Sequence, residues 1–238
     1  MKRPKTILIL GLVLAFGTAA LAAEAWQTKP YTEWSVKDAT RLLDKSPWVS
    51  VFSWGDTTAM RNIANEADDA TMGSEREWVI LITSRLFTAR PVRQAYVALR
   101  AKGDKAALEK YKDFATSDIN EEIIVSWTYD SKPKGVSALR DLDALVRSVS
   151  VAELKPSTFI VTDAGKRVYI QDYRPPTKDG TGAKFSFPRT LEDGTPLIDE
   201  NTKTLRFQTG YFRIKDQVIS VDATFKIKDM VFDGKTEY

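Results

Sequence analysis

The chain has 238 residues, with 35 lysine and arginine residues against 32 aspartate and glutamate residues, and it contains no histidine and no cysteine. These two absences exclude Ser-His-Asp triads, Cys-His nucleophiles, zinc sites built on His or Cys, and haem or iron–sulfur ligation through those residue types. The remaining options are acid–base chemistry by carboxylates, a Ser/Lys pair, a metal bound by oxygen atoms, or no catalysis.

Residues 1–22 have the pattern of a secretory signal peptide. Three basic residues precede an apolar run, which is followed by two A-x-A triplets, Ala20–Ala22 and Ala23–Ala25. The apolar run is shorter than the roughly 20 residues of a membrane-spanning helix, so we expect cleavage near Ala22 or Ala25 and no stable membrane insertion. Cleavage leaves a nearly neutral chain, which argues against nucleic acid as a partner. The lack of cysteine favours a bacterial periplasmic or extracellular location.

The stretch from Lys29 to Gly55 carries the strongest local signals. Ser35 is the expected N-cap of a helix, and Asp38 completes a capping box three residues later. Pro47 is expected to end this helix. The alternation of large and small residues that follows, over 48–54, predicts a strand.

The next hundred residues predict a mixture of helices and strands. Residues 56–76 are polar and small, which indicates a surface loop or a lone helix. Beyond them the patterns predict a strand at 78–83 buried on both faces, a helix from Arg90 to Gly103, a short helix capped by Asp104, a half-buried strand at 123–129, and a helix from Ser137 closed by Lys155 and Pro156.

After Pro156 the patterns are those of short strands and turns. We expect a hairpin over 158–170, a loop at 174–182, and strands at 184–188, 205–207, 211–214, 218–226 and 229–232. The sequence therefore predicts an α+β fold, with a mixed part at 23–155 and an antiparallel β-meander or sandwich at 156–238 packed against it as one unit. A parallel α/β arrangement of the first half is the alternative.

One constellation of charged residues is a candidate binding site. Arg85, Arg90 and Arg93 span a strand-to-helix junction in the segment SRLFTARPVR. A helix N-terminus favours anions, and arginine adds planar forks suited to a carboxylate or phosphate. The alternative is that these arginines pair with acidic neighbours or lie over the core.

Other chemistry-bearing residues give weaker signals. Acidic clusters at 66–69 and 118–122 could supply a carboxylate pair, but solvated loop charges explain them too, and the spacing of a calcium loop is missing. Residues 179–182 lack the third glycine of a phosphate-binding loop and fit a hairpin tip. Six tryptophans suggest saccharide binding, yet four lie on expected strands, where large rings are usually core. We expect no cofactor and no metal.

Three segments, EWSVKDATRLLDKSPW, SRLFTARPVRQA and FKIKDMVFDGKTEY, resemble a group of uncharacterised exported bacterial proteins. The resemblance implies export and a shared architecture, with no activity attached. We therefore expect a non-catalytic binding or interaction module of the bacterial envelope, with an envelope protein, a small organic anion or a saccharide as candidate partner. The alternatives are a carboxylate-dependent hydrolase acting on polysaccharide or cell-wall material, which needs paired acids in a cleft, and a structural subunit, which needs an exposed apolar patch.

Overall fold

Helix α2 (Val36–Lys45) begins where the sequence predicts it in the computed structural model, which describes residues 24–55, 78–214 and 216–238. The Ser35 hydroxyl accepts a hydrogen bond from the Asp38 amide at 3.1 Å, and the Asp38 carboxylate accepts one from the Ser35 amide at 3.0 Å. Such a cap stabilises a helix by about 1 kcal/mol. The predicted segment 56–76 lies outside the described residues.

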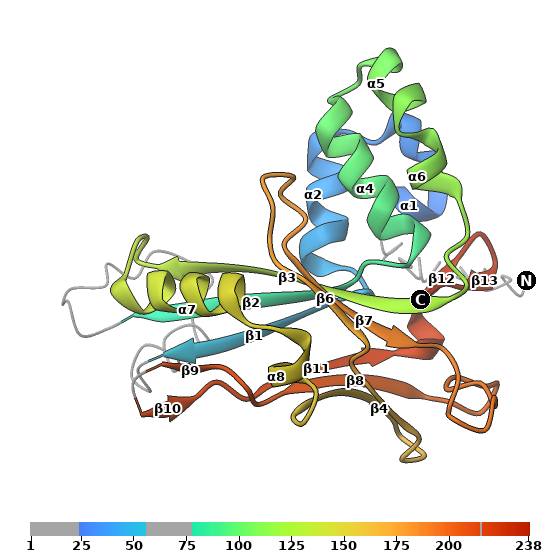
Figure 1. Ribbon diagram of the computed structural model, residues 1–238. Helices are drawn as coiled ribbons and strands as arrows, with labels where there is room; N and C mark the ends of the chain where they lie inside the picture. The colour runs from blue at the N-terminus through green and yellow to red at the C-terminus, as the bar shows by residue number, and fades with distance from the viewer. Residues whose placement is uncertain (1–23, 56–77, 215) are drawn as a thin grey trace, which may run out of the picture.

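A five-stranded sheet, sheet A, has the order β1-β2-β3-β7-β6, and every neighbouring pair in it is antiparallel. Its strands are β1 (Val49–Gly55), β2 (Val79–Leu86), β3 (Glu122–Lys132), β6 (Asp172–Arg174) and β7 (Ala183–Pro188). The parallel alternative for the first half is therefore wrong. Parallel strands need a crossover to the opposite end of the sheet, whereas the helices between β2 and β3 return the chain to the end that it left (Figure 1).

A second antiparallel sheet, sheet B, has the order β11-β8-β4-β5 and lies against sheet A (Figure 1). Its strands are β4 (Thr158–Thr162), β5 (Arg167–Tyr169), β8 (Thr204–Thr209) and β11 (Val221–Lys226). Two small hairpins complete the β structure, β9 (Arg213–Ile214) with β10 (Gln217–Val218), and β12 (Val231–Phe232) with β13 (Lys235–Thr236). Because β6 and β7 belong to sheet A, the two parts of the α+β fold share one sheet.

The core between the sheets is aromatic. Trp127 of β3 lies 5.0 Å from Phe185 of β7 and 5.8 Å from Phe207 of β8, measured between ring centroids, and Phe212 lies 5.3 Å away. All four side chains are fully buried. Removing a ring of this kind typically costs about 3–5 kcal/mol of stability, so these residues hold the two sheets together.

A group of short helices, which we call the helical cap, stands over one end of sheet A (Figure 1). Its members are α1 (Ala25–Thr28), the 3₁₀ turn η1 (Tyr31–Glu33), α2, α4 (Arg90–Ala101), α5 (Lys105–Lys110) and α6 (Lys112–Thr116). The cap has a small core of its own, made of Val97, Ala101, Leu108 and Ala115. Across the described ranges, no helix has the length and apolar character needed to cross a membrane.

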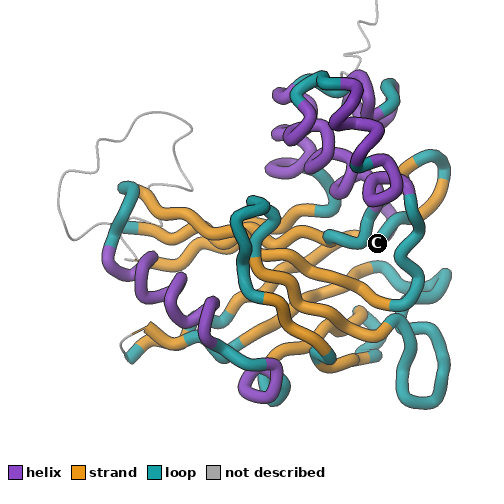
Figure 2. Tube along the Cα trace, turned by 45° about the horizontal axis from the view of Figure 1, so that its top comes forward, coloured by secondary structure: helices purple, strands orange, loops and turns teal. Residues whose placement is uncertain are grey.

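The helix predicted from Ser137 to Lys155 is two helices, α7 (Ser137–Ser148) and α8 (Val151–Leu154). The break occurs because Ser150 forms a capping box with Glu153 and starts a new helix there. Figure 2 shows α7 lying away from the helical cap. Hydrogen bonds from the Tyr129 hydroxyl to Asp143, at 2.7 Å, and from the Tyr173 hydroxyl to the Val146 carbonyl, at 2.5 Å, attach α7 to sheet A.

Candidate functional site

The first of the three predicted arginines, Arg85, lies at the end of β2 beneath α2. Its Nε donates to the Leu43 carbonyl at 2.6 Å, its Nη1 donates to the Thr128 hydroxyl at 2.6 Å, and its Nη2 lies 3.6 Å from the Asp44 carboxylate. The residue is 6% exposed. Arg85 therefore links α2 to sheet A, and these three partners differ from those of Arg90 and Arg93 described below.

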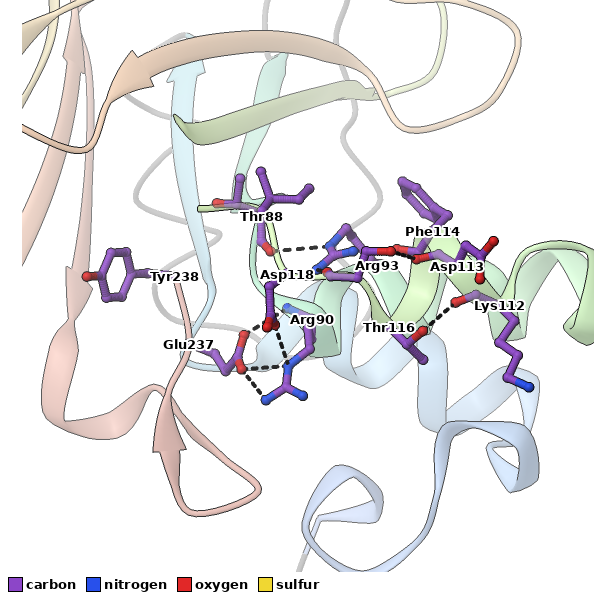
Figure 3. Close-up of polar contacts among 12 residues, drawn as sticks. Thr88, Arg90, Arg93, Lys112, Asp113, Phe114, Thr116, Asp118, Glu237 and Tyr238 are labelled. Atoms are coloured by element: carbon purple, nitrogen blue, oxygen red, sulfur yellow. Dashed lines mark hydrogen bonds and ion pairs between the residues drawn. The ribbon is translucent and has the colours of Figure 1, made fainter. Parts of the chain in front are cut away.

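Arg90, the first residue of α4, holds a carboxylate that belongs to the same chain (Figure 3). Its Nε donates to Glu237 Oε1 at 2.6 Å, its backbone amide donates to Oε2 at 3.3 Å, and its Nη2 forms an ion pair with the same group. The hydrogen bond that Arg90 donates to Glu237 is the main cause of the raised pKa of Arg90. The carboxylate at this helix N-terminus is thus that of Glu237, which is the acidic partner that the alternative interpretation of these arginines expects.

Arg93 is almost completely buried and donates only to backbone carbonyls among the described residues. Its Nε reaches Thr88 at 3.2 Å, its Nη2 reaches Ser117 at 2.5 Å, and its Nη1 reaches Phe114 (Figure 3). Burial lowers the pKa of this guanidinium. Because two of the three acceptors lie at the end of α6, Arg93 fixes α6 against α4.

The last residues of the chain complete this arrangement, which we call the arginine junction. The Trp48 Nε1 donates to the Glu237 carbonyl at 2.8 Å, and Arg189 Nη2 donates to the Tyr238 carbonyl at 2.5 Å. The Arg189 guanidinium also lies 4.5 Å from the centre of the Tyr238 ring. A hollow of about 210 Å³ lies beside Arg93 and Arg189.

The other candidate residues lie partly within and partly outside the described ranges. Five of the six tryptophans are buried and Trp78 is partly buried, so they serve the core rather than an exposed sugar platform. Residues 118–122 line a hollow of about 310 Å³, and residues 66–69 lie outside the described ranges. Within the described ranges, no three acidic side chains gather as a metal site would require.

A larger hollow lies further along α4 than the arginine junction, beside residues 96–100, and we call it the aromatic pocket. Its volume is about 790 Å³. One wall is formed by the helical cap, the other by the β6–β7 loop at 175–182, which rises beside the cap (Figure 1). The residues that line it include Phe87, Tyr96, Leu99, Arg100, Tyr111, Phe114, Arg174, Asp179, Thr181 and Lys184.

The cap wall of the aromatic pocket is largely apolar. The ring of Phe87 lies 5.8 Å from the rings of both Tyr96 and Phe114. Phe114 is 39% exposed, and Arg100 covers the ring of Tyr111 at 5.1 Å. Partly exposed aromatic side chains around a concave surface are typical of small-molecule sites.

The loop wall is fixed by a close backbone approach and a turn. Gly182 has φ +82°, and a Cβ at this position would lie 1.8 Å from the Trp127 carbonyl oxygen, so only glycine fits. The Asp179 carboxylate accepts hydrogen bonds from the Thr181 amide at 2.9 Å and from its hydroxyl at 2.8 Å. The loop predicted as a hairpin tip is therefore held by its own turn and by close backbone contact with β3.

Lys184 of β7 brings a positive charge to the base of the pocket. Its Nζ donates to the Thr181 hydroxyl at 2.6 Å, lies 3.7 Å from the Asp179 carboxylate and lies 5.2 Å from the centre of the Phe87 ring. Only 12% of its side chain is exposed. Burial is the main cause of the lowered pKa of this amine.

The strand register continues this polar base across sheet A. Arg85, Ser126, Lys184 and Arg174 are directly opposite one another on β2, β3, β7 and β6, so their side chains share the face covered by the helical cap. The Tyr96 hydroxyl and the Ser126 hydroxyl are buried without a protein hydrogen-bond partner. Burial raises the pKa of Tyr96, while Arg85 and Ser126 beside it oppose that rise.

The sequence contained partial signals for this pocket. The helical spacing of Tyr96, Leu99, Tyr111 and Phe114 predicted apolar faces, but not that part of these faces stays open. Lys184 alternates with Ala183 and Phe185, which placed it on the opposite side of a strand from the core. Nothing local indicated that this side of the strand would be covered, because the covering helices come from a distant segment.

A second hollow, of about 800 Å³, lies beside β5 and is lined by Arg167, Tyr169, Leu191 and their neighbours. None of its described lining residues carries a buried, unpartnered polar side-chain atom.

Searches with family models, against curated proteins and against solved structures find no match to this chain. Function is therefore argued from the site alone.

Proposed function

We propose that this chain is an exported, non-catalytic binding module of the bacterial envelope that holds a small, largely apolar molecule in the aromatic pocket. The observation that carries the proposal is the combination of a hollow of about 790 Å³, partly exposed aromatic walls and a few buried polar groups at one end. Ligand sites in proteins have this size and this combination of apolar walls with few polar groups.

The arginine junction supports the proposal by contrast. Its guanidinium groups already have hydrogen-bond acceptors within the chain, namely Glu237 for Arg90 and three backbone carbonyls for Arg93. A ligand there must compete with these internal acceptors. A ligand in the aromatic pocket gains contact with rings that are partly exposed to water, so burying them is favourable.

The hydrolase alternative needs two carboxyl groups about 5–10 Å apart across a cleft. Asp179 is the one carboxylate among the described residues that line the aromatic pocket. Its hydrogen bonds to Thr181 contribute to its lowered pKa, although burial opposes that shift. A single ionised carboxylate engaged in a turn gives no acid–base pair, so the pocket favours binding over hydrolysis.

Fluorescence of the neutral dye N-phenyl-1-naphthylamine tests the proposal. We expect saturable enhancement with the wild-type protein and a several-fold weaker affinity in Phe114→Ala, because that ring covers the pocket wall. Tyr169→Ala is the matched control, since it removes a ring of similar exposure from the second hollow. Absence of saturable binding, or loss of binding in Tyr169→Ala alone, would overturn the proposal.

A further inference from the structure

We infer that the molecule held in the aromatic pocket is an amphiphilic carboxylate, with its apolar body against the cap wall and its carboxylate at Lys184. This inference rests on the proposed function and adds the chemical class of the ligand. The juxtaposition behind it is a mostly buried ammonium group at the base of an aromatic hollow, next to hydroxyl groups that have no protein partner.

The donors at the base suit an anion. Lys184 Nζ carries a positive charge, and its side chain is only 12% exposed. The hydroxyl of Tyr96, which lines the pocket, has no protein partner at ordinary hydrogen-bond geometry, although Ser126 and Arg85 lie beside it. Ser126 is directly opposite Lys184 in the strand register. A carboxylate accepts several hydrogen bonds at once, and those from a charged donor are the strongest.

The charge around the pocket also favours an anion. Arg100 and Arg174 lie at its rim and Lys184 at its base, whereas Asp179 is the one acidic group among the described lining residues. Arg174 has acidic partners on its own sheet, Glu122 and Asp172, each at 3.5 Å. Lys184 is thus the cation at the base of the pocket, and Arg100 is a second cation at its rim.

Asp179 acts as a weak internal counter-ion to this lysine. Its Oδ2 lies 3.7 Å from Lys184 Nζ, beyond hydrogen-bond distance, while its Oδ1 is engaged by Thr181. A ligand carboxylate can therefore approach Lys184 more closely than Asp179 does. The charge of Asp179 repels such a carboxylate. Removing that charge should therefore strengthen binding of the ligand, whereas a substitution that damages a site weakens it.

Competition against the neutral dye provides the test. The competitors are 4-phenylbutyrate and 4-phenylbutyramide, which have the same apolar body and differ in the charge of the head group. We expect the carboxylate to displace the dye from the wild-type protein at about a tenfold lower concentration than the amide does, as for a hydrogen bond to a charged group.

Two variants and one control show which residues cause the preference for the carboxylate. Lys184→Met should abolish the preference for the carboxylate over the amide, whereas Lys178→Met, on the same loop but outside the pocket lining, should leave that preference and the dye affinity unchanged. Asp179→Asn keeps an oxygen acceptor for Thr181 and removes the charge. It should therefore strengthen binding of the carboxylate by about threefold without affecting the amide.

Equal competition by the two compounds in the wild-type protein would overturn the inference while leaving the proposed function intact. Failure of the dye to bind would instead overturn the proposed function. If Lys184→Met does not fold, as judged by circular dichroism, the wild-type ratio and the Asp179→Asn result decide the question. A weaker carboxylate affinity in Asp179→Asn would also contradict the inference.

Discussion

The arginine junction and the aromatic pocket flank the same helix, α4, and differ in how their charges are satisfied. At the junction, Arg90 holds Glu237 and Arg93 holds three backbone carbonyls. In the pocket, Lys184 faces a largely apolar hollow, and the hydroxyl of Tyr96 has no protein partner at ordinary hydrogen-bond geometry. The comparison shows that a cluster of cations is weak evidence for a ligand until their partners within the chain are known.

The largest expected effect is loss of stability on removing the Arg93 guanidinium. Arg93→Met would leave the carbonyls of Thr88, Phe114 and Ser117 without their donor in a buried site. We expect the free energy of unfolding to fall by about 4 kcal/mol, as measured by urea denaturation. A decrease smaller than that of Arg90→Met, whose side chain is more exposed, would show that Arg93 is not the anchor of α6.

A slightly smaller effect is expected at Gly182, where the loop wall of the pocket meets β3. Gly182→Ala combines an unfavourable positive φ with a clash against the Trp127 carbonyl, so we expect a loss of about 3 kcal/mol and weaker dye binding. Gly180→Ala is the matched control, because it has φ +77° and open space around a Cβ. It should cost about 1 kcal/mol and retain dye binding. Equal losses in both variants would mean that contact with β3 does not set the loop.

A moderate effect is expected at the junction. Glu237→Ala removes the carboxylate from Arg90 and should lower the free energy of unfolding by about 2 kcal/mol. It should also leave the predicted anion site open, so that acetate raises the melting temperature of the variant more than that of the wild-type protein. An equal response of the two proteins to acetate would show that Glu237 does not occupy an anion site.

The smallest effect concerns pH and a region away from both sites. Hydrogen bonds from Arg147 and then Tyr129 lower the pKa of Asp143 below its ordinary value of 3.8. Because the folded-state pKa is depressed, this carboxylate stabilises the fold above that value, and the stabilisation is lost as the pH falls through the folded pKa. The melting temperatures of wild type and Asp143→Asn should therefore converge in acid. A difference that is constant with pH would contradict this role.

Local signals predicted much of the fold. The capping box at Ser35 and the cap at Asp104 are present, as is the hairpin formed by β4 and β5. The sequence predicts one helix where the structure has α7 and α8, because the apolar stripe continues to Val149. The capping box that Ser150 forms with Glu153 starts the second helix. Propensity and caps act over a few residues, so such features are readable from the chain.

The sites depended on contacts between distant segments. Arg90 meets Glu237 across 147 residues, and no local pattern indicates such a pair. Lys184 gains its surroundings from α4 and α6, which precede it in the chain by about a third of its length. The sequence therefore predicted the chemistry of an anion at the helix N-terminus, while the identity of that anion and the existence of the pocket required the tertiary structure.

Dye binding in two variants tests the central claim most directly, namely that the aromatic pocket rather than the arginine junction takes the ligand. Leu99→Trp fills the pocket from the cap wall, and Glu237→Gln alters the junction without emptying it. We expect N-phenyl-1-naphthylamine to lose its affinity for the Leu99→Trp variant and to bind Glu237→Gln as it binds the wild-type protein. Unchanged binding to Leu99→Trp together with loss in Glu237→Gln would contradict the claim.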